Sequence, residues 1–341
     1  MKITKKRRNI IFTALAAALI ILAAASMIIG RYSISIGELP GLLKSLFSGT
    51  EPADSSAYTV LFQSRIPRII AAGLIGCGLS VSGASYQGVF RNPMVSPDLL
   101  GASAGAGFGA ALGLLWGTPQ IVVQVMAFAL GILAVVCALG LSRAAGREQD
   151  NSRLILVLCG IVVGALFQAF ISIVKYVADP FDTMPSISFW LMGGLTYVTA
   201  SDILILLVPV TIGVTILMLL RWKLNLLAFG DDEASAMGVS VVKYRIIVIG
   251  CATLMTAASV AVGGMIGWVG LIVPHFARIM VGPDYRRMLP CAALLGAIFM
   301  IVVDTIARCA FAQELPIGIL TAIIGAPVFA VLFLKGKKGF I

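Results

Sequence analysis

Charged residues are scarce in this 341-residue sequence. Asp, Glu, Lys and Arg together make up 12 %, about half of the share in ordinary soluble domains. Apolar residues make up 60 %, and the mean hydropathy is +1.04. Several apolar runs reach the roughly 20 residues that cross a bilayer core. The composition therefore predicts an all-α, polytopic membrane protein, with too little sequence left for a soluble domain of about 100 residues.

The residues that most enzymes and metal sites need are also few. Histidine occurs once, as His275, and the six cysteines lie singly in apolar runs, with no CxxC pair. They are interpreted as small packing residues, so neither a metal site nor a disulfide framework is predicted. A GxxxxGK[ST] loop is absent, so the chain cannot hold ATP phosphates in that way. We expect no enzyme activity and no bound cofactor, and any ATP and Mg²⁺ would be used by another subunit.

The net charge of +10 could suggest a nucleic-acid partner. The basic residues, however, lie in short loops beside apolar runs, which is the positive-inside pattern of membrane proteins. Placing both termini and the loops at 91, 143–153, 221–245 and 278–287 on one side gathers 19 of the 25 basic residues there. We therefore predict contact with the lipid bilayer and not with nucleic acid, and both termini in the cytoplasm.

The apolar runs predict ten membrane-spanning helices in one domain that covers residues 1–341. The first run has no small-residue cleavage site before the next polar sequence, so it is interpreted as a retained helix and not a signal peptide. Two acidic loops are expected outside, one ending at Thr59 and one between 178 and 202, where Trp190 and Tyr197 could lie at the interface. The helices are expected at about 10–30, 65–90, 98–117, 120–142, 154–177, 203–220, 242–262, 288–308 and 317–334, with a short helix within 263–280 that is interrupted by Gly270 and Pro274.

Glycines at every fourth position from 101 to 117 give the third of these helices a small-residue face. Such a face lets another backbone approach closely in a membrane. Packing within one bundle is favoured over a seam between two copies of the chain.

The longest polar stretch between apolar runs is 221–245, bracketed by basic residues. Its middle segment, GDDEASAMG, predicts a short helix. Asp231 can cap this helix, the two acids that follow suit the positive end of its dipole, and Gly238 would end it. We interpret it as a helix outside the bilayer that a partner protein grips and moves. A plain solvated loop is the alternative.

Three arginines are predicted on the outer side, where topology disfavours them. Arg65 and Arg68 share a face at the start of the second helix, and Arg308 lies at the outer end of the ninth. They could receive carboxylates from a partner outside the cell. Pairing with lipid headgroups or with loop acids such as Glu51 and Asp54 is the alternative.

Ionisable residues inside the predicted spans are few. Asp304 and Arg308 are four residues apart on one helix, so they share a face and can form a structural pair. A proton-coupled carrier would usually have more buried acids. Their scarcity counts against a secondary transporter without excluding it.

Four stretches resemble one family. They are RIPRIIAAGLIGCGLSVSGASYQGVFRNPMVSPDLLGASAGAGFG, LAFGDDEASAMGV, GWVGLIVPHFARIMVGPDYRRMLP and DTIARCAFAQELPIGILTAIIGAPVFAVLF. Together they run from about residue 65 to 334 and resemble the membrane permease subunits of ABC importers for iron-siderophore, haem and cobalamin complexes. The first 60 residues carry little of this resemblance.

The resemblance implies a ten-helix, type II importer permease fold in a bacterial cytoplasmic membrane. It implies a homodimer or a pair with a paralogue, two cytoplasmic ATPase subunits and an extracytoplasmic substrate-binding protein. An iron complex is the expected substrate, with ferric siderophore first and haem or cobalamin next. An ion-gradient-driven transporter without an ATPase is the alternative.

The resemblance also implies three groups of site residues. Docking of the binding protein is expected at Arg65, Arg68 and Arg308. Coupling to the ATPase is expected within 224–240, at Phe229, Gly230, Asp231, Asp232, Glu233, Ala234, Ala236, Met237 and Gly238. Structural or gating roles are expected for Gln87, Asn92, Pro93, Pro274, His275, Arg278, Glu314 and Pro316.

Overall fold

The fold was analysed in a computed structural model that describes residues 4–35, 37–48, 55–146, 152–311 and 313–336. Within these ranges every regular element is helical. In chain order the elements are α1 (Lys5–Ile28), α2 (Leu39–Ser48), α3 (Ser55–Thr59), a π-helical turn (Val60–Arg65), α4 (Ile66–Val89), a 3-10 turn (Pro97–Leu100), α5 (Ala102–Leu115), α6 (Gln120–Ala144), α7 (Ser152–Val177), α8 (Thr183–Leu191), α9 (Ala200–Phe229), α10 (Asp231–Ala236), α11 (Val241–Gly263), α12 (Val269–Val281), α13 (Tyr285–Cys309) and α14 (Ile317–Gly336).

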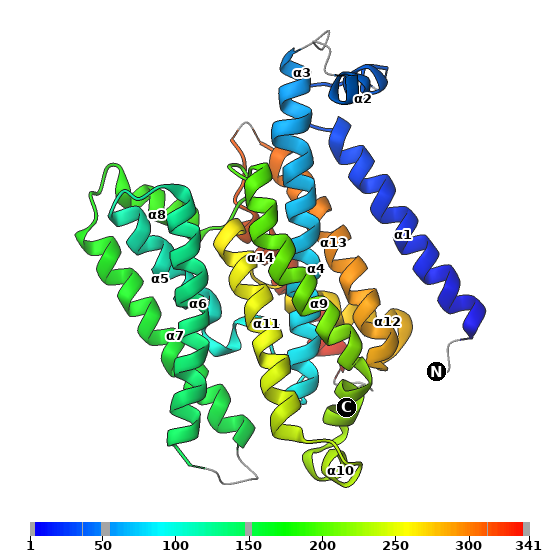
Figure 1. The fold of residues 1–341 in the computed structure, drawn as a ribbon, viewed down its shortest axis with the longest axis vertical. Helices are drawn as coiled ribbons and strands as arrows, with labels where there is room; N and C mark the ends of the chain where they lie inside the picture. Colours follow the sequence, from blue (N-terminus) through cyan, green and yellow to red (C-terminus); the bar gives the residue numbers. More distant parts are fainter. Residues whose placement is uncertain (1–3, 36, 49–54, 147–151, 312, 337–341) are drawn as a thin grey trace.

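Helix α4 is the central element of the bundle, with α9, α11, α12 and α13 packed around it (Figure 1). Its small residues let neighbouring backbones come close. A methyl group added at Gly76 would overlap the carbonyl oxygen of Gly296 in α13, and one added at Gly83 would overlap that of Gly270 in α12. Close backbone packing of this kind is how helices associate where lipid removes the hydrophobic driving force.

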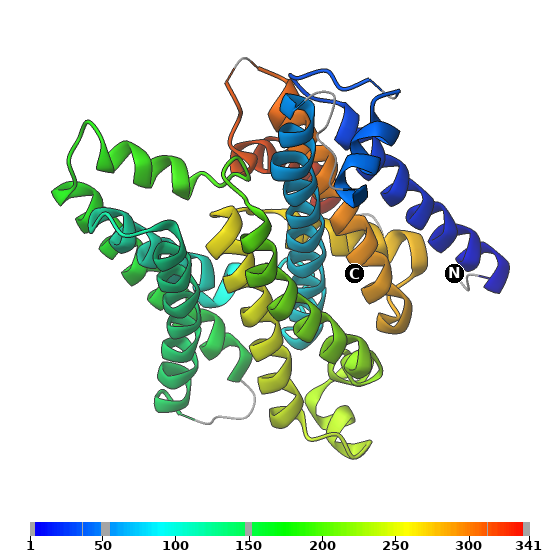
Figure 2. The same ribbon diagram turned by 45° about the horizontal axis from the view of Figure 1, so that its top comes forward.

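Helices α5, α6 and α7 form a second group beside this core, on the left in Figures 1 and 2. The glycine face predicted from the sequence lies between helices of the same chain. Gly105 meets the carbonyl oxygen of Leu130, and Gly109 meets that of Met126, both in α6. The prediction of packing within the bundle is confirmed for these two positions.

Helix α1 lies at the edge of the bundle, on the right in both views, and contacts mainly α13. Leu15 is its one buried apolar residue, and Ile10, Ile20 and Ile21 are among the exposed ones. Because exposed apolar side chains of this kind suit contact with lipid rather than water, α1 is interpreted as a helix at the lipid-facing edge of the bundle.

Seven of the described helices are long and apolar enough to cross a membrane, and three shorter apolar helices cover 102–115, 269–281 and 317–332. The prediction of a polytopic all-α membrane protein is confirmed. The count of ten crossings stays a prediction. Helix α1 begins and helix α14 ends in the lower half of Figure 1, which also carries α10, while α2 and α3 lie at the opposite end.

Several predicted boundaries were wrong. The helix expected over 203–220 continues as α9 to Phe229, so the first part of the polar stretch 221–245 is helical and not a loop. The helix expected from 65 is continuous from Ser55, which shortens the outer loop. Within the second acidic loop, residues 183–191 form α8. The third helix is broken at Gly101, whose φ of +83° ends the preceding 3-10 turn.

The segment expected to be interrupted at Gly270 and Pro274 is instead a continuous helix, α12. The backbone bends before it, where Gly264 and Trp268 have positive φ values of 68° and 70°. Gly270 is needed for close packing, since Pro97 and the Leu79 carbonyl oxygen fill the space that a side chain would take.

Candidate functional site

The short helix expected near residue 230 is α10, and it forms one tip of the molecule (Figure 1). It begins after Gly230 and is followed by Gly238, whose φ of +75° turns the chain as predicted. Gly230 and not Asp231 occupies the capping position, so the predicted cap was wrong. All three acids lie in the first turn, at the positive end of the helix dipole.

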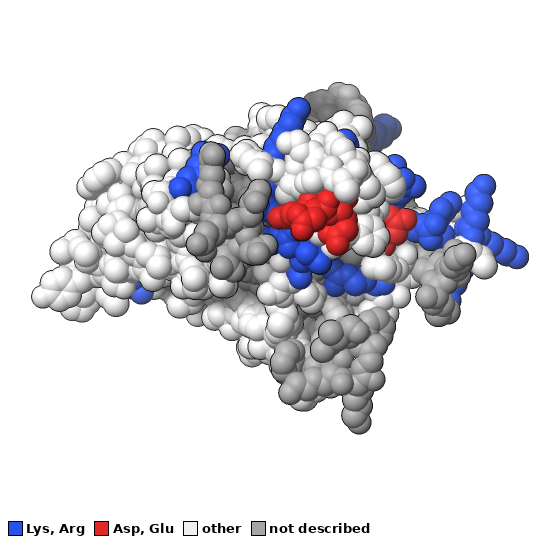
Figure 3. All heavy atoms as spheres, turned by 90° about the horizontal axis from the view of Figure 1, so that it is seen from below, with Lys and Arg blue, Asp and Glu red and all other residues white. Residues whose placement is uncertain are grey.

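Asp231 instead forms a bridge between three helices. Its two carboxylate oxygens accept separate hydrogen bonds from Arg153 at the start of α7 and from Arg245 in α11, the latter at 2.7 Å. Figure 3 shows this end of the molecule, where an acidic patch lies directly beside basic side chains. We call Arg153, Asp231 and Arg245 the α10 latch, because they fasten α10 to the nearby ends of α7 and α11.

The charge of Asp231 is secured by its two partners. Partial burial acts to raise the pKa of its carboxyl group, but the hydrogen bonds and positive charges of Arg245 and Arg153 outweigh it and lower the pKa below the ordinary 3.8. The latch is therefore fully charged at neutral pH.

The remaining predicted coupling residues near the latch differ in their exposure. Ala234 is fully buried, whereas Phe229 and Met237 are 66 % and 52 % exposed. Asp232, Glu233 and Ala236 are also exposed. The outer surface of α10 thus combines carboxylates with exposed apolar side chains, which is suitable for contact with another protein.

The family-motif residues at the same end form internal contacts. Arg278 of α12 donates to the side-chain oxygen of Gln87 at 3.0 Å, and the Gln87 amide group donates to the Leu271 carbonyl at 3.3 Å. The Asn92 side chain accepts from the Met94 amide in the turn after α4. The two hydrogen bonds of the Gln87 side chain tie α4 to α12.

The other residues of this motif are placed as follows. Pro93 is exposed in the turn after α4, Pro274 is buried within α12, and His275 is half-buried beside it. In the described part of the chain no group of three or more His, Cys, Asp or Glu residues could hold a metal ion.

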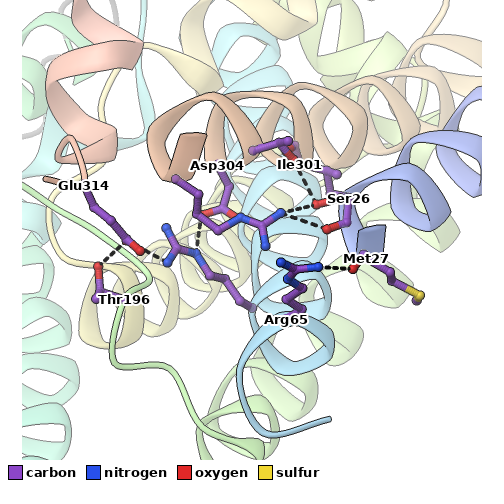
Figure 4. Close-up of polar contacts among 10 residues, drawn as sticks. Ser26, Met27, Arg65, Thr196, Ile301, Asp304 and Glu314 are labelled. Carbon is purple, nitrogen blue, oxygen red and sulfur yellow. Dashed lines mark hydrogen bonds and ion pairs between the residues drawn. The ribbon is translucent and has the colours of Figure 1, made fainter. Parts of the chain in front are cut away.

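At the opposite end, the three arginines expected to face outward are buried. Arg68 donates to Asp304 and to Glu314, both at 2.7 Å, and its side chain is 5 % exposed (Figure 4). Arg308 lies 3.6 Å from Asp304, so the predicted structural pair is present, and it also donates to Ser26. Of the two alternatives for these arginines, pairing with a loop acid is present for Arg68, through Glu314 and not through the acids that were suggested.

Arg65 has no carboxylate partner in the described residues and bonds to backbone instead. It donates to the carbonyl oxygen of Met27 at 2.6 Å (Figure 4), to that of Ile28 at 3.0 Å and to that of Tyr32. These oxygens include the unpaired carbonyls at the end of α1, so Arg65 caps that helix. The suggested acids Glu51 and Asp54 lie outside the described residues, and the docking role of the arginines stays a prediction.

Glu314 joins this cluster to the wall of a cavity. It accepts hydrogen bonds from Arg68 and, at 2.8 Å, from Thr196 in the loop before α9. Partial burial acts to raise the pKa of Glu314, but the charge and hydrogen bond of Arg68 and the Thr196 hydroxyl lower it. Pro316 follows and its carbonyl oxygen accepts from the first turn of α14.

The cavity has a volume of about 830 Å³, within the range of small-molecule sites. Its wall combines aromatic side chains with amide, hydroxyl and charged groups. Trp190 and Tyr197 both line the cavity, and Tyr197 is 81 % exposed, so the interface role expected for these two residues stays a prediction. Polar members of the lining are Arg31, Arg68, Thr118, Gln120, Gln124, Ser186, Thr196, Gln313 and Glu314.

Sequence reasoning missed Arg153, Thr196 and Gln124. Gln124 donates from α6 to the buried Asp202 of α9 at 2.9 Å, beside the cavity. A polar residue within a predicted span was the available signal for Gln124. Arg153 had been counted only as an inner-side charge, and no local pattern connects it to Asp231.

A model of the FecCD transport family matches residues 5–335. The chain belongs to this family. It is 39 % identical over 323 residues to the Haemophilus influenzae "Molybdate import system permease protein MolB", covering 94 % of each chain. It is 35 % identical to a Helicobacter pylori "Probable iron chelatin transport system permease protein", covering 95 % of this chain and 98 % of the relative.

A solved structure described as an inward-facing conformation of a metal-chelate type ABC transporter superposes with a TM-score of 0.85 and 37 % identity. The match covers 96 % of this chain and 99 % of that one. The chain is therefore an ABC importer permease of the FecCD family, and the fold predicted from the resemblance is confirmed.

Proposed function

We propose that this permease passes an iron complex through the bacterial cytoplasmic membrane, with ferric siderophore as the first candidate and haem or cobalamin next. A binding protein delivers the complex to the end that carries the cavity. Two ATPase subunits act on α10 from the cytoplasm, where both termini also lie, and a second copy or a paralogue completes the pathway. Nucleotide and Mg²⁺ are used by the ATPase and not by this chain.

One observation carries this proposal: α11 runs from the α10 latch to the cavity. Arg245 in its first turns holds Asp231, and Ala261 and Val262 near its other end line the cavity. A helix rises about 1.5 Å per residue, so these positions are roughly 25 Å apart along one rod. A displacement of α10 would therefore reach the cavity wall without passing through a loop.

The cavity supports a chelated metal as the cargo. Its volume exceeds what a small oxyanion needs, and aromatic residues such as Phe189 and Trp190 suit the organic shell of a chelate. A molybdate-like oxyanion is the second candidate, because Arg31 and Arg68 lie on the wall and a relative carries the name of a molybdate permease.

The docking role of the arginines requires an exchange of partners. Asp304 is 1 % exposed at its side chain, whereas Glu314 is 27 % exposed. A carboxylate on a binding protein could therefore replace Glu314 as a partner of Arg68, but it could not replace the buried Asp304. Such an exchange would also release Glu314 from Thr196 at the cavity wall.

Uptake assays test the proposal. The permease is expressed with its cognate ATPase and binding protein in a host that lacks its own iron-chelate and molybdate importers, and ⁵⁵Fe-siderophore, ⁵⁵Fe-haem, labelled cobalamin and ⁹⁹Mo-molybdate are compared. We expect uptake of an iron chelate that stops when the ATPase carries an inactive nucleotide site. Molybdate uptake alone would favour the second candidate, and uptake that persists without ATP hydrolysis would indicate a gradient-driven carrier.

A further inference from the structure

A second, basic cleft lies at the α10 end of the molecule, between α1, α9 and α13. Its volume is about 390 Å³, and it is separate from the large cavity. Its lining residues are Arg8, Phe12, Arg221, Asp284, Arg286, Arg287 and Pro290. Four guanidinium groups therefore surround one carboxylate.

The single carboxylate is already engaged. Asp284 accepts from the Asn225 side chain at 2.7 Å and from the Arg286 backbone amide at 3.0 Å, as the cap of α13. Its only ion pair among the described residues is to Arg287 at 4.0 Å, which is a weak contact. The acid therefore neutralises little of the positive charge in the cleft.

The other arginines are held without carboxylates. Arg286 stacks 4.2 Å above the ring of Trp222, and Arg221 donates only a long bond of 3.4 Å to the Arg286 carbonyl. In the described ranges no ion pair joins Arg8 or Arg221 to an acid. The cleft thus presents a surplus of positive charge that an anion can neutralise.

The surroundings of the cleft are apolar and open to lipid. Phe12 and Pro290 form its apolar walls, and the exposed face of α1 continues from Phe12 along the helix. Arg65 and Arg308 bind the last turn of α1 at its far end, whereas its first half is held by apolar packing of residues such as Leu15. Trp222, half-exposed beside the cleft, is a residue type that favours the headgroup level of a membrane.

The density of basic groups here is visible from below. Figure 3 shows basic side chains gathered toward the side where α1 begins, beside a second, smaller acidic patch. Lys5, Lys6 and Arg7 of the first turn of α1 add to this charge. Basic pockets between membrane helices at the cytoplasmic surface bind anionic lipid headgroups.

We propose that this cleft binds the phosphate of an anionic membrane lipid, with the guanidinium groups on the headgroup and an acyl chain along α1 and α13. Inorganic phosphate offers the same charge, but it makes no use of the apolar walls. The site is independent of the transported substrate and of the ATPase.

The test uses the purified full-length protein, stripped of lipid in detergent and titrated with cardiolipin or phosphatidylcholine while bound lipid is counted by native mass spectrometry. The variant Arg8→Gln/Arg221→Gln removes two charges from the cleft. Arg143→Gln/Lys243→Gln removes two exposed charges elsewhere at the same end and serves as the control. Arg8→Lys/Arg221→Lys keeps the charge.

One basic residue near an anionic surface contributes roughly a factor of five in binding, so loss of two should weaken cardiolipin binding roughly 25-fold. The control and the lysine variant should bind nearly as the unaltered protein does, and added inorganic phosphate should displace little cardiolipin. Equal affinity of the glutamine and control variants, or no preference for cardiolipin over phosphatidylcholine, would overturn the proposal. Ready displacement by phosphate would also overturn it and indicate a free-anion site.

Discussion

The α10 latch gives the most direct test of how a movement of α10 is transmitted to the helix bundle. Asp231→Asn removes the charge that holds both Arg153 and Arg245, while the shape of the side chain is kept. Asp231 is about one-third exposed, so each ion pair is screened and contributes roughly 0.5–1 kcal/mol. Two pairs together correspond to roughly 1–2 kcal/mol, or about a 5- to 30-fold change in the fraction of molecules with α10 fastened.

The consequence should appear in coupling and not in assembly. We expect Asp231→Asn to retain the ATPase during purification and to keep ATP hydrolysis, while substrate transported per ATP falls severalfold. Because the pKa of Asp231 is below 3.8, the latch stays charged above that pH, and the difference between variant and parent should be constant from about pH 6 to pH 8.

Transport and hydrolysis are measured together in proteoliposomes. A second readout follows the latch itself, through the distance distribution between spin labels on α10 and α7. Asp232→Asn, which removes the neighbouring charge and breaks no ion pair in the described residues, is the control for that distance. An unchanged distance and unchanged transport per ATP in Asp231→Asn would refute the reasoning. Loss of ATPase binding would instead assign Asp231 to the contact itself.

Two further predictions concern the core and the outer cluster. Gly83→Ala should lower the thermal unfolding temperature in detergent strongly, since the added methyl group overlaps the Gly270 backbone and overpacking costs roughly 1–3 kcal/mol. Gly250→Ala is the control, because nothing lies within 4 Å of the added methyl group, and it should be neutral or stabilising. Equal unfolding temperatures of the two variants would contradict the packing argument. Arg68→Glu should reduce the yield of folded protein, because removing one partner of a buried ion pair costs roughly 3–5 kcal/mol. The new carboxylate would also lie beside that of Asp304 and repel it. A variant that folds normally would show that the ion pair is dispensable.

The local features of this protein could be predicted from the sequence, because they depend on neighbouring residues. Apolar runs of membrane length predicted the long helices, and a glycine after a short acidic segment predicted where α10 ends. Boundaries failed where a helix continues through polar residues, as α9 does to Phe229. Its polar residues lie at the end of a long helix that is anchored by tertiary packing, and local composition does not report this.

Long-range pairs were beyond sequence reasoning for a physical reason. Arg68 is separated from Asp304 by 236 residues and from Glu314 by 246, and Arg153 is 78 residues from Asp231. Each pair exists because the fold brings distant segments together, and where helices and their loops meet is decided by packing along whole helices. A residue's charge and expected side of the membrane can be read locally, but its partner cannot.

The same distinction explains why the burial of Arg65, Arg68 and Arg308 was not predicted from the sequence. The positive-inside rule counts basic residues by side and does not distinguish a free guanidinium from one that is neutralised within the protein. Arg68 and Arg308 share Asp304, and Arg65 satisfies the carbonyl groups that end α1, so these residues hold α1, α4 and α13 together. Because their charges are compensated inside the bundle, their position at the end opposite α10 does not by itself require a partner. Any docking function must therefore be added to this structural role, at the one carboxylate in the cluster that remains partly exposed, Glu314.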